Sequence, residues 1–593
     1  MDEFCRGILN TFLTLDDFNK MNIEKTKIHL IDLQKSFYNL DELKEQMVLF
    51  IIQPDKEIFG NILEIYFLIS SKFKGVETCI IFIPGESYEI IEIMMGNDLM
   101  NKFKMFSFNI DLFPIDNDLL SLEKENCFRE IYIDKNLTSI SELANAFVKL
   151  ESCFGKVKHS YIKGDNAKTF ETLVREKEKE NNIKSNNEIL GMIVLDRSVD
   201  FLTALTSNYT YEGLIDDFFG INLSSIKIRE SFIKKDLPKR RKDSNSDKNE
   251  KMVAYHLNSF MNNFYSQISC MNYLDAKKYL QKVRNYYLNL INEEKSGKKQ
   301  SIEEFKKYTN ELTTFKLEIN EPLFANENII YYIIDKLANE KYKEYIKNEQ
   351  ILLLGIIPLN LHLYYEYYIS EKRDLLQILK LMVIECLTQG GIDGYNQIKR
   401  DILNIYGYQN IFLFRDLEHL GWLKEKAYIK NLMDNSHEQV IKKLELVNYN
   451  ANDEKIENCS YVMNGFCPLS LRLIEKGIEG KWNTIQEIIK KIPGEVSFPL
   501  DESEISKPNN ELNTIFLVFV GGVTYTEIEG VRYLNRKFKE AFDKSKSKKP
   551  KRTQLIIVTT GILNSKKIFN NLGKKFKSIY TMKQFHEQAK KDK

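Results

Sequence analysis

Short apolar runs that end at a proline or glycine recur near the start of the sequence, and they constrain the fold more than any other feature. Val48–Ile52 and Cys79–Ile83 are two of them, and Ile62–Phe73 between them has the apolar spacing of a helix. Continuous runs of this length are typical of strands in a parallel sheet that is covered on both faces. We predict one α/β domain over residues 1–135, with further strands at Ile28–Ile31, Phe106–Phe113 and Ile131–Ile133.

Three similar runs predict a second parallel sheet: Ile189–Leu195, Ile515–Val520 and Leu555–Val558. Because a long segment separates the first run from the other two, the second α/β domain is expected to be split, over residues 136–230 and 450–593. The intervening residues 231–449 have mostly helical patterns and predict an inserted helical domain. The fold class is therefore α/β plus α.

The inserted domain is expected to contain a helical hairpin over about residues 251–345. Its first helix is indicated by apolar residues at steps of three and four, with polar segments at either end of the pattern. Beyond the hairpin, Leu375–Leu387 and a segment through Ile398 and Ile405 predict a compact helical part. The apolar residues of this predicted first helix are Val253, Leu257, Phe260, Phe264, Ile268 and Met271.

The charge balance argues against a nucleic-acid partner. The chain has 85 Lys and Arg against 84 Asp and Glu, a formal net charge of +1, so no long-range field attracts the molecule to a polyanion. One basic run, Arg536–Arg552, has nine basic and two acidic residues. It could touch anionic lipid, but a solvated loop is the simpler interpretation.

The cysteines and apolar segments predict a cytosolic protein. None of the eight cysteines forms a C-x-x-C pair or stands near histidines at zinc-finger spacing, so we expect no metal site and no disulfide scaffold. The first residues, Met1–Arg6, are acidic where a secretory signal would be basic. The apolar runs fall short of the roughly 20 residues that span a bilayer. Any membrane association is therefore expected to be peripheral.

Asp196, Arg197 and Asp200 follow a probable parallel strand, at the sheet edge where α/β enzymes bind ligands. An α/β hydrolase or nucleotide-binding enzyme could use the two aspartates to hold a metal or position a nucleophile. However, the sequence has no G-x-S-x-G elbow and no metal-ligand spacing at this point. We favour a structural Asp–Arg network, because buried charges require partners.

Gly521 and Gly522 stand between a strand and a helix, where a phosphate could bind free backbone N–H groups. Neither dinucleotide-binding nor P-loop glycine patterns are present, so we predict no cofactor. The two glycines are expected to allow a sharp turn into a closely packed helix that Thr524 or Thr526 caps.

Several segments, in order along the chain, resemble the SM (Sec/Munc-like) family of syntaxin-binding vesicle-fusion proteins, within it the branch of vacuolar protein sorting-associated protein 33. The resemblance rests on these segments occurring in the same order as in the family over nearly the full length of the chain. The segments are Phe108–Glu123, Tyr161–Ala167, Leu195–Asp200, Thr210–Gly220 with Glu212 and Gly213, Ile405–Tyr408, Tyr461–Ser470 and Phe519–Ile528.

The resemblance implies a three-domain arch and a function in holding other proteins. A protein of this kind is no enzyme; it would hold syntaxin-type and vesicle-type SNARE helices in register for membrane fusion on endosomal and vacuolar or lysosomal membranes. Proteins of the vacuolar branch are subunits of the HOPS and CORVET tethers. The hairpin tip is the expected contact for SNAREs.

The same branch uses a helical tether subunit, similar to vacuolar protein sorting-associated protein 16, that docks on the third domain. Val440, Ile441, Leu444 and Val447 form an amphipathic stretch that could receive it, although the interior of the domain is the simpler place for such a stripe. The alternative within the family is a secretory-branch protein that binds one syntaxin without a tether.

Overall fold

The computed structural model forms two compact units, one of residues 1–112 with 575–593 and one of residues 113–574. Each unit is described by itself, and every structural statement concerns the residues that the structure describes. These are 47–52, 56–72, 77–82, 85–96, 98–107, 111–181, 188–233, 252–257, 263–296, 320–356, 358, 361–426, 436–448, 458–499, 512–544 and 552–573.

The first unit contains a three-stranded parallel sheet in the order β1-β2-β3. The predicted strands at Val48 and Cys79 and the helix between them are confirmed. Buried side chains such as Phe59, Ile80 and Met94 form one core between the sheet and its helices. The elements are β1 (Met47–Ile52), α3 (Lys56–Lys72), β2 (Glu77–Phe82), α4 (Tyr88–Gly96) and β3 (Phe103–Ser107).

Two of the predicted strands in this region are wrong, and a third lies outside the described residues, at Ile28–Ile31. Ile131 belongs to a helix, α5 (Cys127–Tyr132). The strand prediction failed because a short buried apolar run fits a helix as well as a strand. The run Phe106–Phe113 is not one strand: Phe106 lies in β3, whereas Phe113 begins β4 in the sheet of the second unit. The units divide after Leu112, and the three-domain boundaries stay a prediction.

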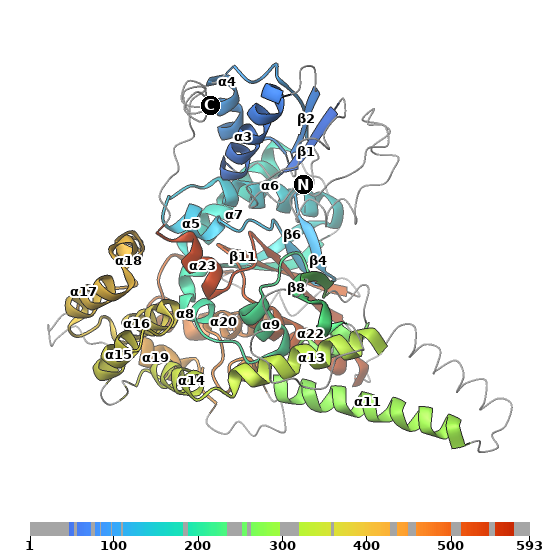
Figure 1. Cartoon of the computed structure of the whole chain (residues 1–593), viewed down its shortest axis with the longest axis vertical. Helices are drawn as coiled ribbons and strands as arrows, with labels where there is room; N and C mark the ends of the chain where they lie inside the picture. The colour runs from blue at the N-terminus through green and yellow to red at the C-terminus, as the bar shows by residue number, and fades with distance from the viewer. Residues whose placement is uncertain are drawn as a thin grey trace. The chain divides into compact units, whose positions relative to one another are not determined.

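The second unit contains a seven-stranded sheet in the order β10-β6-β7-β11-β12-β5-β4, in which only the edge strands β10 and β4 are antiparallel to their neighbours. Figure 1 labels β4, β6 and β11 of this sheet. Val518 of β11 lies opposite Val194 of β7 and Val558 of β12. The strands are β4 (Phe113–Asp116), β5 (Leu119–Ser121), β6 (Lys156–Lys163), β7 (Glu188–Asp196), β10 (Val496–Ser497), β11 (Leu512–Val520) and β12 (Arg552–Thr559).

Helices cover this sheet and explain the apolar runs. Val194 and Val518 are fully buried because α7 packs on β11, α20 on β7 and α22 on β12. Since β7 pairs with β11 across the helical insertion, the predicted fold class and split sheet are confirmed. The helices are α6 (Thr138–Phe154), α7 (Asp165–Glu180), α8 (Phe201–Leu205), α9 (Tyr211–Phe219), α20 (Leu469–Ile478), α21 (Gln486–Ile489), α22 (Tyr525–Lys544) and α23 (Ser565–Asn571).

The insertion begins with a β-hairpin rather than the predicted long helix. β8 (Ser225–Arg229) pairs antiparallel with β9 (Met252–His256), so the helical prediction at Val253 is wrong. Val253 and Leu257 fit a step of four, but Val253, Tyr255 and Leu257 also fit the two-residue period of a strand. A short helix, α10 (Asn263–Ile268), follows.

Two long helices then run side by side, α11 (Tyr273–Ser296) and α13 (Asn320–Leu337) (Figure 1). We call these two helices the hairpin. The predicted helices at Leu375–Leu387 and Ile398–Ile405 are confirmed as α16 and α17. The remaining helices of the insertion are α14 (Glu340–Leu353), α15 (Leu361–Ser370), α16 (Leu375–Gln389), α17 (Tyr395–Tyr406), α18 (Ile411–His419) and α19 (Ser436–Lys443). Across the described ranges, no helix is both long enough and apolar enough to span a bilayer.

Candidate functional site

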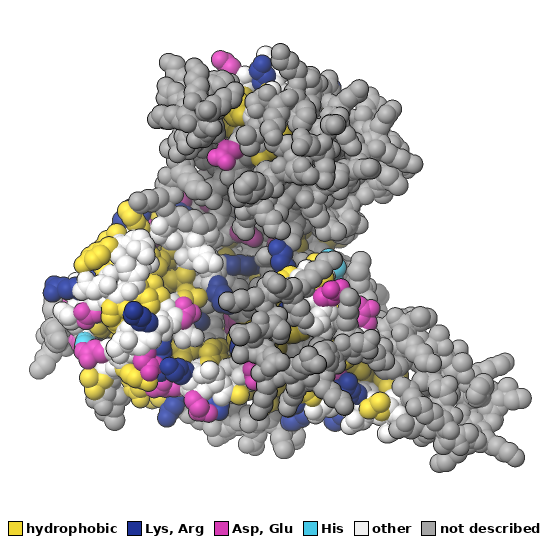
Figure 2. Space-filling view, in the orientation of Figure 1, with side chains coloured by type: hydrophobic (Ala, Val, Ile, Leu, Met, Phe, Trp, Pro, Cys, Tyr) yellow, Lys and Arg dark blue, Asp and Glu magenta, His cyan; other side chains and the backbone are white. Residues whose placement is uncertain are grey.

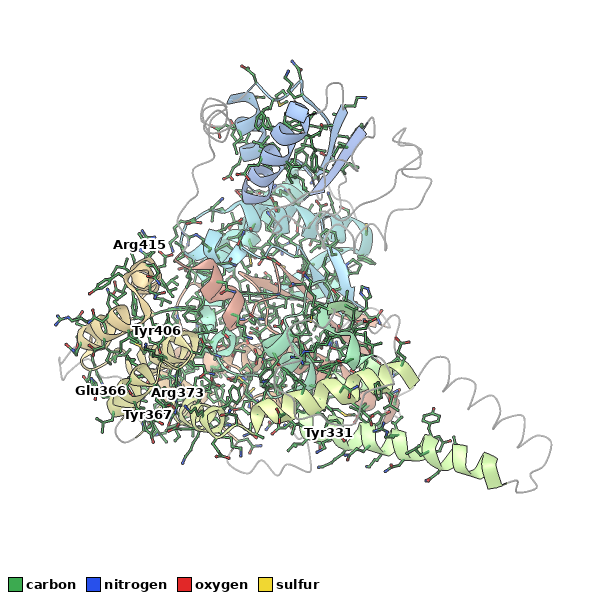
Figure 3. The ribbon with its side chains drawn as sticks, in the orientation of Figure 1. Tyr331, Glu366, Tyr367, Arg373, Tyr406 and Arg415 are labelled. Atoms are coloured by element: carbon green, nitrogen blue, oxygen red, sulfur yellow. The ribbon has the colours of Figure 1, made fainter. Side chains whose placement is uncertain are left out.

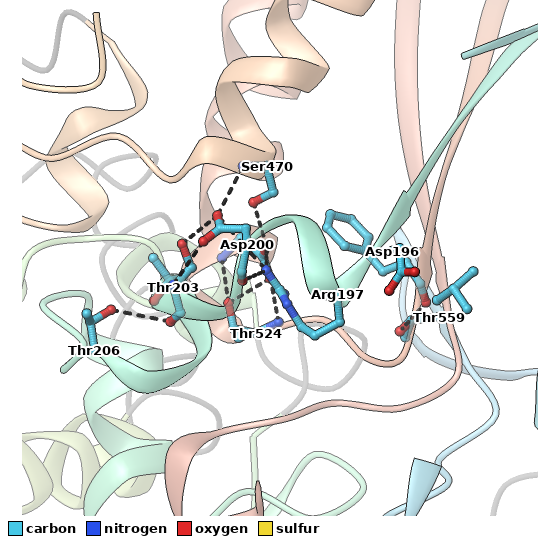
Figure 4. Close-up of polar contacts among 12 residues, drawn as sticks. Asp196, Arg197, Asp200, Thr203, Thr206, Ser470, Thr524 and Thr559 are labelled. Carbon is cyan, nitrogen blue, oxygen red and sulfur yellow. Dashed lines mark hydrogen bonds and ion pairs between the residues drawn. The ribbon is translucent and has the colours of Figure 1, made fainter. Parts of the chain in front are cut away.

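Asp196, labelled in Figure 4, ends β7, and both oxygens of its carboxylate accept hydrogen bonds from the chain itself. Oδ1 accepts hydrogen bonds from the Ser198 N–H at 3.0 Å and from the Tyr132 hydroxyl. Oδ2 accepts from the backbone N–H and the side-chain amide of Asn166, both at 3.0 Å. Burial and the Asp196 charge raise the pKa of Tyr132 well above its ordinary value, so the phenol keeps the proton that it donates.

Arg197 forms a buried two-pronged ion pair with Glu527 at the start of α22. Nη1 lies 2.6 Å from Oε2, Nη2 lies 2.9 Å from Oε1, and the Arg197 side chain is 1% exposed. Burial opposes the charge, but the Glu527 carboxylate outweighs it and raises the pKa of Arg197. The Arg197 guanidinium therefore stays charged in the interior, with the Glu527 carboxylate as its partner.

Asp200 joins this ion pair to two further segments. Its carboxylate accepts from the Thr203 N–H at 3.1 Å and hydroxyl at 2.7 Å, which caps α8. It also accepts from the Ser470 N–H at 3.0 Å, at the start of α20, while the Ser470 hydroxyl donates to Glu527. The residues after β7 thus connect the starts of α8, α20 and α22.

The two glycines after β11 permit close packing at this point. Gly521 has φ +88°, and a Cβ there would lie 2.4 Å from the Tyr132 hydroxyl oxygen. Gly522 has φ +104°, and its Cβ would lie 2.4 Å from Leu563. Thr524 then starts α22 in a capping box: its N–H donates to Glu527 Oε2 at 3.0 Å, and the Glu527 N–H donates back to its hydroxyl at 3.3 Å.

Glu212 belongs to a second buried charge cluster, centred on Arg532 in α22. The Arg532 guanidinium lies within 2.7 Å of Glu212, 2.8 Å of Asp116, 3.2 Å of Glu529 and 3.4 Å of Asp118. Burial raises the pKa of Glu212 well above its ordinary value, although Arg532 opposes the shift. The cluster links the β4–β5 turn, α9 and α22.

Gly213, next to Glu212, allows α9 to pack against Asn208. A Cβ at this position would lie 2.7 Å from Asn208 Oδ1, the atom that also accepts the Thr526 hydroxyl hydrogen bond. Gly213 therefore permits a link between α9 and the start of α22.

Both clusters are made of contacts within the chain itself, as expected of a structural network. The oxygens of Asp196 and Asp200 are occupied by protein donors, and no group of three metal-ligating side chains is found among the described residues. A surface cleft of about 330 Å³ lies elsewhere, and Asp196 and Asp200 do not line it. Its lining includes Glu125, Asp216, Asn222, Asn564 and Lys567.

Sequence reasoning singled out Asp196, Arg197 and Asp200 after one strand and, separately, Gly521 and Gly522 after another. The structure brings the two segments together, since Val520 pairs with Asp196 and Tyr132 contacts both. Sequence reasoning missed the partners that complete the network. For Glu527 a signal existed, because Thr524-x-x-Glu527 has the capping-box spacing. The Arg532 cluster had no such signal, because its members come from separate segments. The missed partners are Tyr132, Asn166, Ser470, Glu527, Glu529, Arg532, Asp116 and Asp118.

The stretch considered for tether docking lies largely in the interior. Val440, Ile441 and Leu444 are buried, and Val447 is half-buried. Exposed apolar side chains lie instead on α15, α17 and α18 and on the turn between α17 and α18, where Figure 2 shows hydrophobic groups on the surface. These are Leu363, Tyr367, Ile405, Tyr408 and Ile411, which we call the α15–α18 patch.

Comparisons with known proteins agree with the resemblance read from the sequence. A family model described as the Sec1 family matches residues 1–571. Vacuolar protein sorting-associated protein 33A of Rattus norvegicus is 27% identical, with 82% of each chain covered. The vacuolar protein-sorting-associated protein 33 homolog of Arabidopsis thaliana is 24% identical, with 82% of this chain and 79% of that protein covered.

Solved structures of SM proteins share the fold. The Unc18–syntaxin 1 complex from Monosiga brevicollis superposes with a TM-score of 0.53 at 11% identity, covering 89% of this chain and 87% of that one. The SM protein Vps45 in complex with the Qa SNARE Tlg2 gives 0.52 at 14% identity, covering 95% and 91%. The similarity to the SM family and to its vacuolar branch is thereby confirmed.

Proposed function

Because this chain belongs to the Sec1 family, we propose that it is a SNARE-binding chaperone of vesicle fusion in endosomal and vacuolar or lysosomal traffic. The match over residues 1–571 carries the proposal, supported by relatives named for vacuolar protein sorting. Two structural neighbours were solved bound to a syntaxin or a Qa SNARE. In this role the protein aligns helices of other proteins and breaks no covalent bond.

The buried charge clusters support a holding role. The carboxylates most suited to catalysis, Asp196 and Asp200, are fully used in joining strand β7 to helices α8, α20 and α22. Such a network makes a rigid scaffold. A rigid scaffold is what a template needs, since disordered SNARE segments pay the cost of ordering when they bind.

The hairpin offers a surface that suits an amphipathic helix. Leu274, Gln281 and Leu288 follow one another along α11 at the heptad spacing used by coiled coils. Both leucines are about half exposed, at 48% each, and Gln281 donates to the hydroxyl of Tyr331 on α13 at 3.4 Å. Figure 3 shows Tyr331 between the two helices. We call Leu274, Leu288 and Tyr331 the hairpin stripe and assign it to SNARE contact.

A tether subunit is the second proposed partner. The α15–α18 patch is apolar, exposed and separate in sequence from the hairpin, so it can receive a helical subunit similar to vacuolar protein sorting-associated protein 16. Membership of a HOPS or CORVET tether would place the chain on its membrane through partners. The alternative is a secretory-branch activity, in which one syntaxin binds and no tether does.

A crossed binding experiment tests both surfaces. One variant replaces the hairpin stripe (Leu274→Ser, Leu288→Ser, Tyr331→Ser), and a chemically matched one changes the α15–α18 patch (Leu363→Ser, Ile405→Ser, Tyr408→Ser). We expect the first to weaken binding of purified SNARE helices by more than about tenfold and spare tether capture, and the second to do the reverse.

The wild-type chain provides the reference for this experiment. If it captures a helical tether subunit stoichiometrically, the vacuolar branch is supported; if it binds syntaxin alone, the secretory alternative is. A wild-type chain that binds neither kind of partner contradicts the proposed function. Equal loss of SNARE binding in both triple variants contradicts the assignment to the hairpin.

A further inference from the structure

Tyr211, the first residue of α9, contacts the chain just before α11 and also contacts α13. Its backbone N–H donates to the Met271 carbonyl at 2.8 Å, just before α11 begins. Its hydroxyl donates to Asn326 Oδ1 in α13 at 2.9 Å. The side chains of Tyr211 and Asn326 are both fully buried. One residue outside the hairpin thus holds the chain on both sides of it.

Hydrogen bonds hold both the nitrogen and the oxygen of the Asn326 side-chain amide. Its Nδ2 donates to the Pro322 carbonyl at 2.7 Å and to the Tyr255 hydroxyl in β9 at 3.3 Å. These bonds orient the amide so that Oδ1 faces Tyr211. A buried amide oxygen that lost this donor would be left without a partner, which costs more than the bond itself contributes.

The root of α11 is held by backbone pairing with the same segment. The Glu212 N–H donates to the Ser269 carbonyl at 3.1 Å, and Thr210 and Asn272 form an isolated antiparallel bridge. This pairing fixes α11 through the backbone. The α13 helix is reached through the side chain of Tyr211, and Phe219 at the end of α9 adds a ring contact with Tyr332 of α13 at 5.2 Å.

Two further contacts join α11 to α13 directly. The Arg284–Glu327 ion pair spans 2.9 Å, but the Arg284 side chain is 45% exposed. The Lys277 ammonium lies 5.6 Å from the centre of the Tyr331 ring. The Glu327 side chain is only 5% exposed, so the Arg284–Glu327 ion pair is partly buried. The Tyr211–Asn326 bond differs from both contacts because both of its side chains are fully buried.

We propose that Tyr211 is the positioning residue of the hairpin: its hydroxyl bond to Asn326 fixes α13 relative to α11, and so sets the spacing within the hairpin stripe. Its part in SNARE binding rests on the proposed function. The placement of the helices does not, and it can be measured on the free protein.

The variant Tyr211→Phe isolates the hydroxyl, since the ring and its packing remain. We expect local opening of the hairpin to become about tenfold more frequent, which corresponds to about 1.4 kcal/mol. The matched control is Tyr209→Phe, two residues away, because the Tyr209 hydroxyl accepts from Gln350 of α14 at 2.8 Å and not from the hairpin.

Hydrogen–deuterium exchange of the full chain without partners is the measurement. Tyr211→Phe should accelerate exchange in α11 and α13 while amides of β7 and β11 keep the wild-type rate. Tyr209→Phe should affect α14 and leave the hairpin unchanged. The proposal would be overturned if α11 and α13 exchanged at the wild-type rate in Tyr211→Phe. It would also be overturned if Tyr209→Phe accelerated exchange in these helices as much as Tyr211→Phe does.

Asn326→Leu provides a second route if Tyr211→Phe does not fold. This variant should loosen the hairpin too, and the double variant should exchange no faster than Asn326→Leu alone, because both changes remove the same bond. Fully additive effects would show that the two residues act independently and would overturn the pairing.

Affinity for a purified syntaxin-type SNARE helix completes the test. We expect Tyr211→Phe to bind up to about tenfold more weakly and Tyr209→Phe to bind like the wild type. A loosened hairpin with unchanged affinity would overturn the link to SNARE binding. A wild-type chain that binds no SNARE helix would contradict the proposed function, while the exchange data would still decide the role of Tyr211.

Discussion

The Arg197 guanidinium and the Glu527 carboxylate, 330 positions apart in the sequence, form a buried pair with two hydrogen bonds of 2.6 and 2.9 Å. The pair joins the end of β7 to the start of α22 and so ties together the two parts of a sheet that the helical insertion divides. Because neither side chain reaches solvent, each is the other's main source of charge compensation.

Breaking this pair should destabilise the second unit severely. We expect Arg197→Met or Glu527→Gln to lower the free energy of unfolding by about 3–5 kcal/mol, because one charge or its hydrogen-bonding partner is left uncompensated in the interior. The double variant should cost less than the sum of the two. Native-state hydrogen exchange at β7 and β11 measures this, and additive losses would mean that the residues do not act as a pair.

Neutralising Asp196 distinguishes the structural role from the enzymatic alternative. In the wild type, hydrogen-bond donors face both oxygens of the Asp196 carboxylate. In Asp196→Asn an amide NH₂ group replaces one oxygen and faces these donors, so we expect a loss of about 1–3 kcal/mol in unfolding free energy. Thermal denaturation is the measurement. Unchanged stability together with the loss of a hydrolytic or nucleotide-dependent turnover would instead support an enzyme.

Gly164 should tolerate no side chain, whereas Gly390, a glycine that also has a positive φ but lies in the left-handed helical region, should. Gly164 has φ +110°, and a Cβ there would lie 2.1 Å from the Asp196 Cβ. Gly390, which caps α16 with φ +78°, has no atom within 4 Å of the equivalent point. We expect Gly390→Ala to cost about 1–2 kcal/mol from backbone strain alone. Gly164→Ala should cost clearly more, and equal losses in melting experiments would contradict the close approach.

Stability should fall as pH rises from about 4.5 to about 7, through two buried glutamates. Burial raises the pKa of Glu151 to about 7, with Glu178 beside it adding to the shift, and burial raises the pKa of Glu385 to about 7. Each binds a proton in the folded chain at pH values where the unfolded chain has released it, so folding is favoured at the lower pH.

The slope attributable to each glutamate is at most about 1.4 kcal/mol per pH unit. Denaturant titrations of wild type and Glu151→Gln between pH 4.5 and 8 measure it by difference, which removes the contribution of all other groups. The variant should show the shallower decline with pH. Parallel curves for the two proteins would show that Glu151 titrates normally.

Much of the fold was predictable because burial leaves a mark on local composition. The strands around Val194, Val518 and Val558 lie under helices on their faces, so nearly every residue in them is apolar and the runs stand out. The strand at Met252–His256 was mistaken for helix because its apolar residues satisfy both periods, and its pairing with β8 decides between them. Ile131 shows the same ambiguity in a run too short to have a period.

The candidate site was only half predictable for a different reason. Asp196, Arg197 and Asp200 stand together in the sequence and signal a polar group at a sheet edge. Glu527 and Ser470 lie far along the chain, and nothing local marks them as partners of Arg197 and Asp200. The Tyr211–Asn326 bond is of the same kind, since it joins segments that meet only after the insertion has folded back.

By itself the sequence determined the two parallel sheets, the division of the second by a helical insertion and the membership of a family, since these depend on local apolar patterns and on the order of motifs. Only the tertiary structure decided which charges neutralise one another, that Val440, Ile441 and Leu444 are buried, and that one tyrosine contacts both the segment before α11 and the α13 helix. Those outcomes depend on distances between remote segments, and such distances are fixed by the packing of the whole chain.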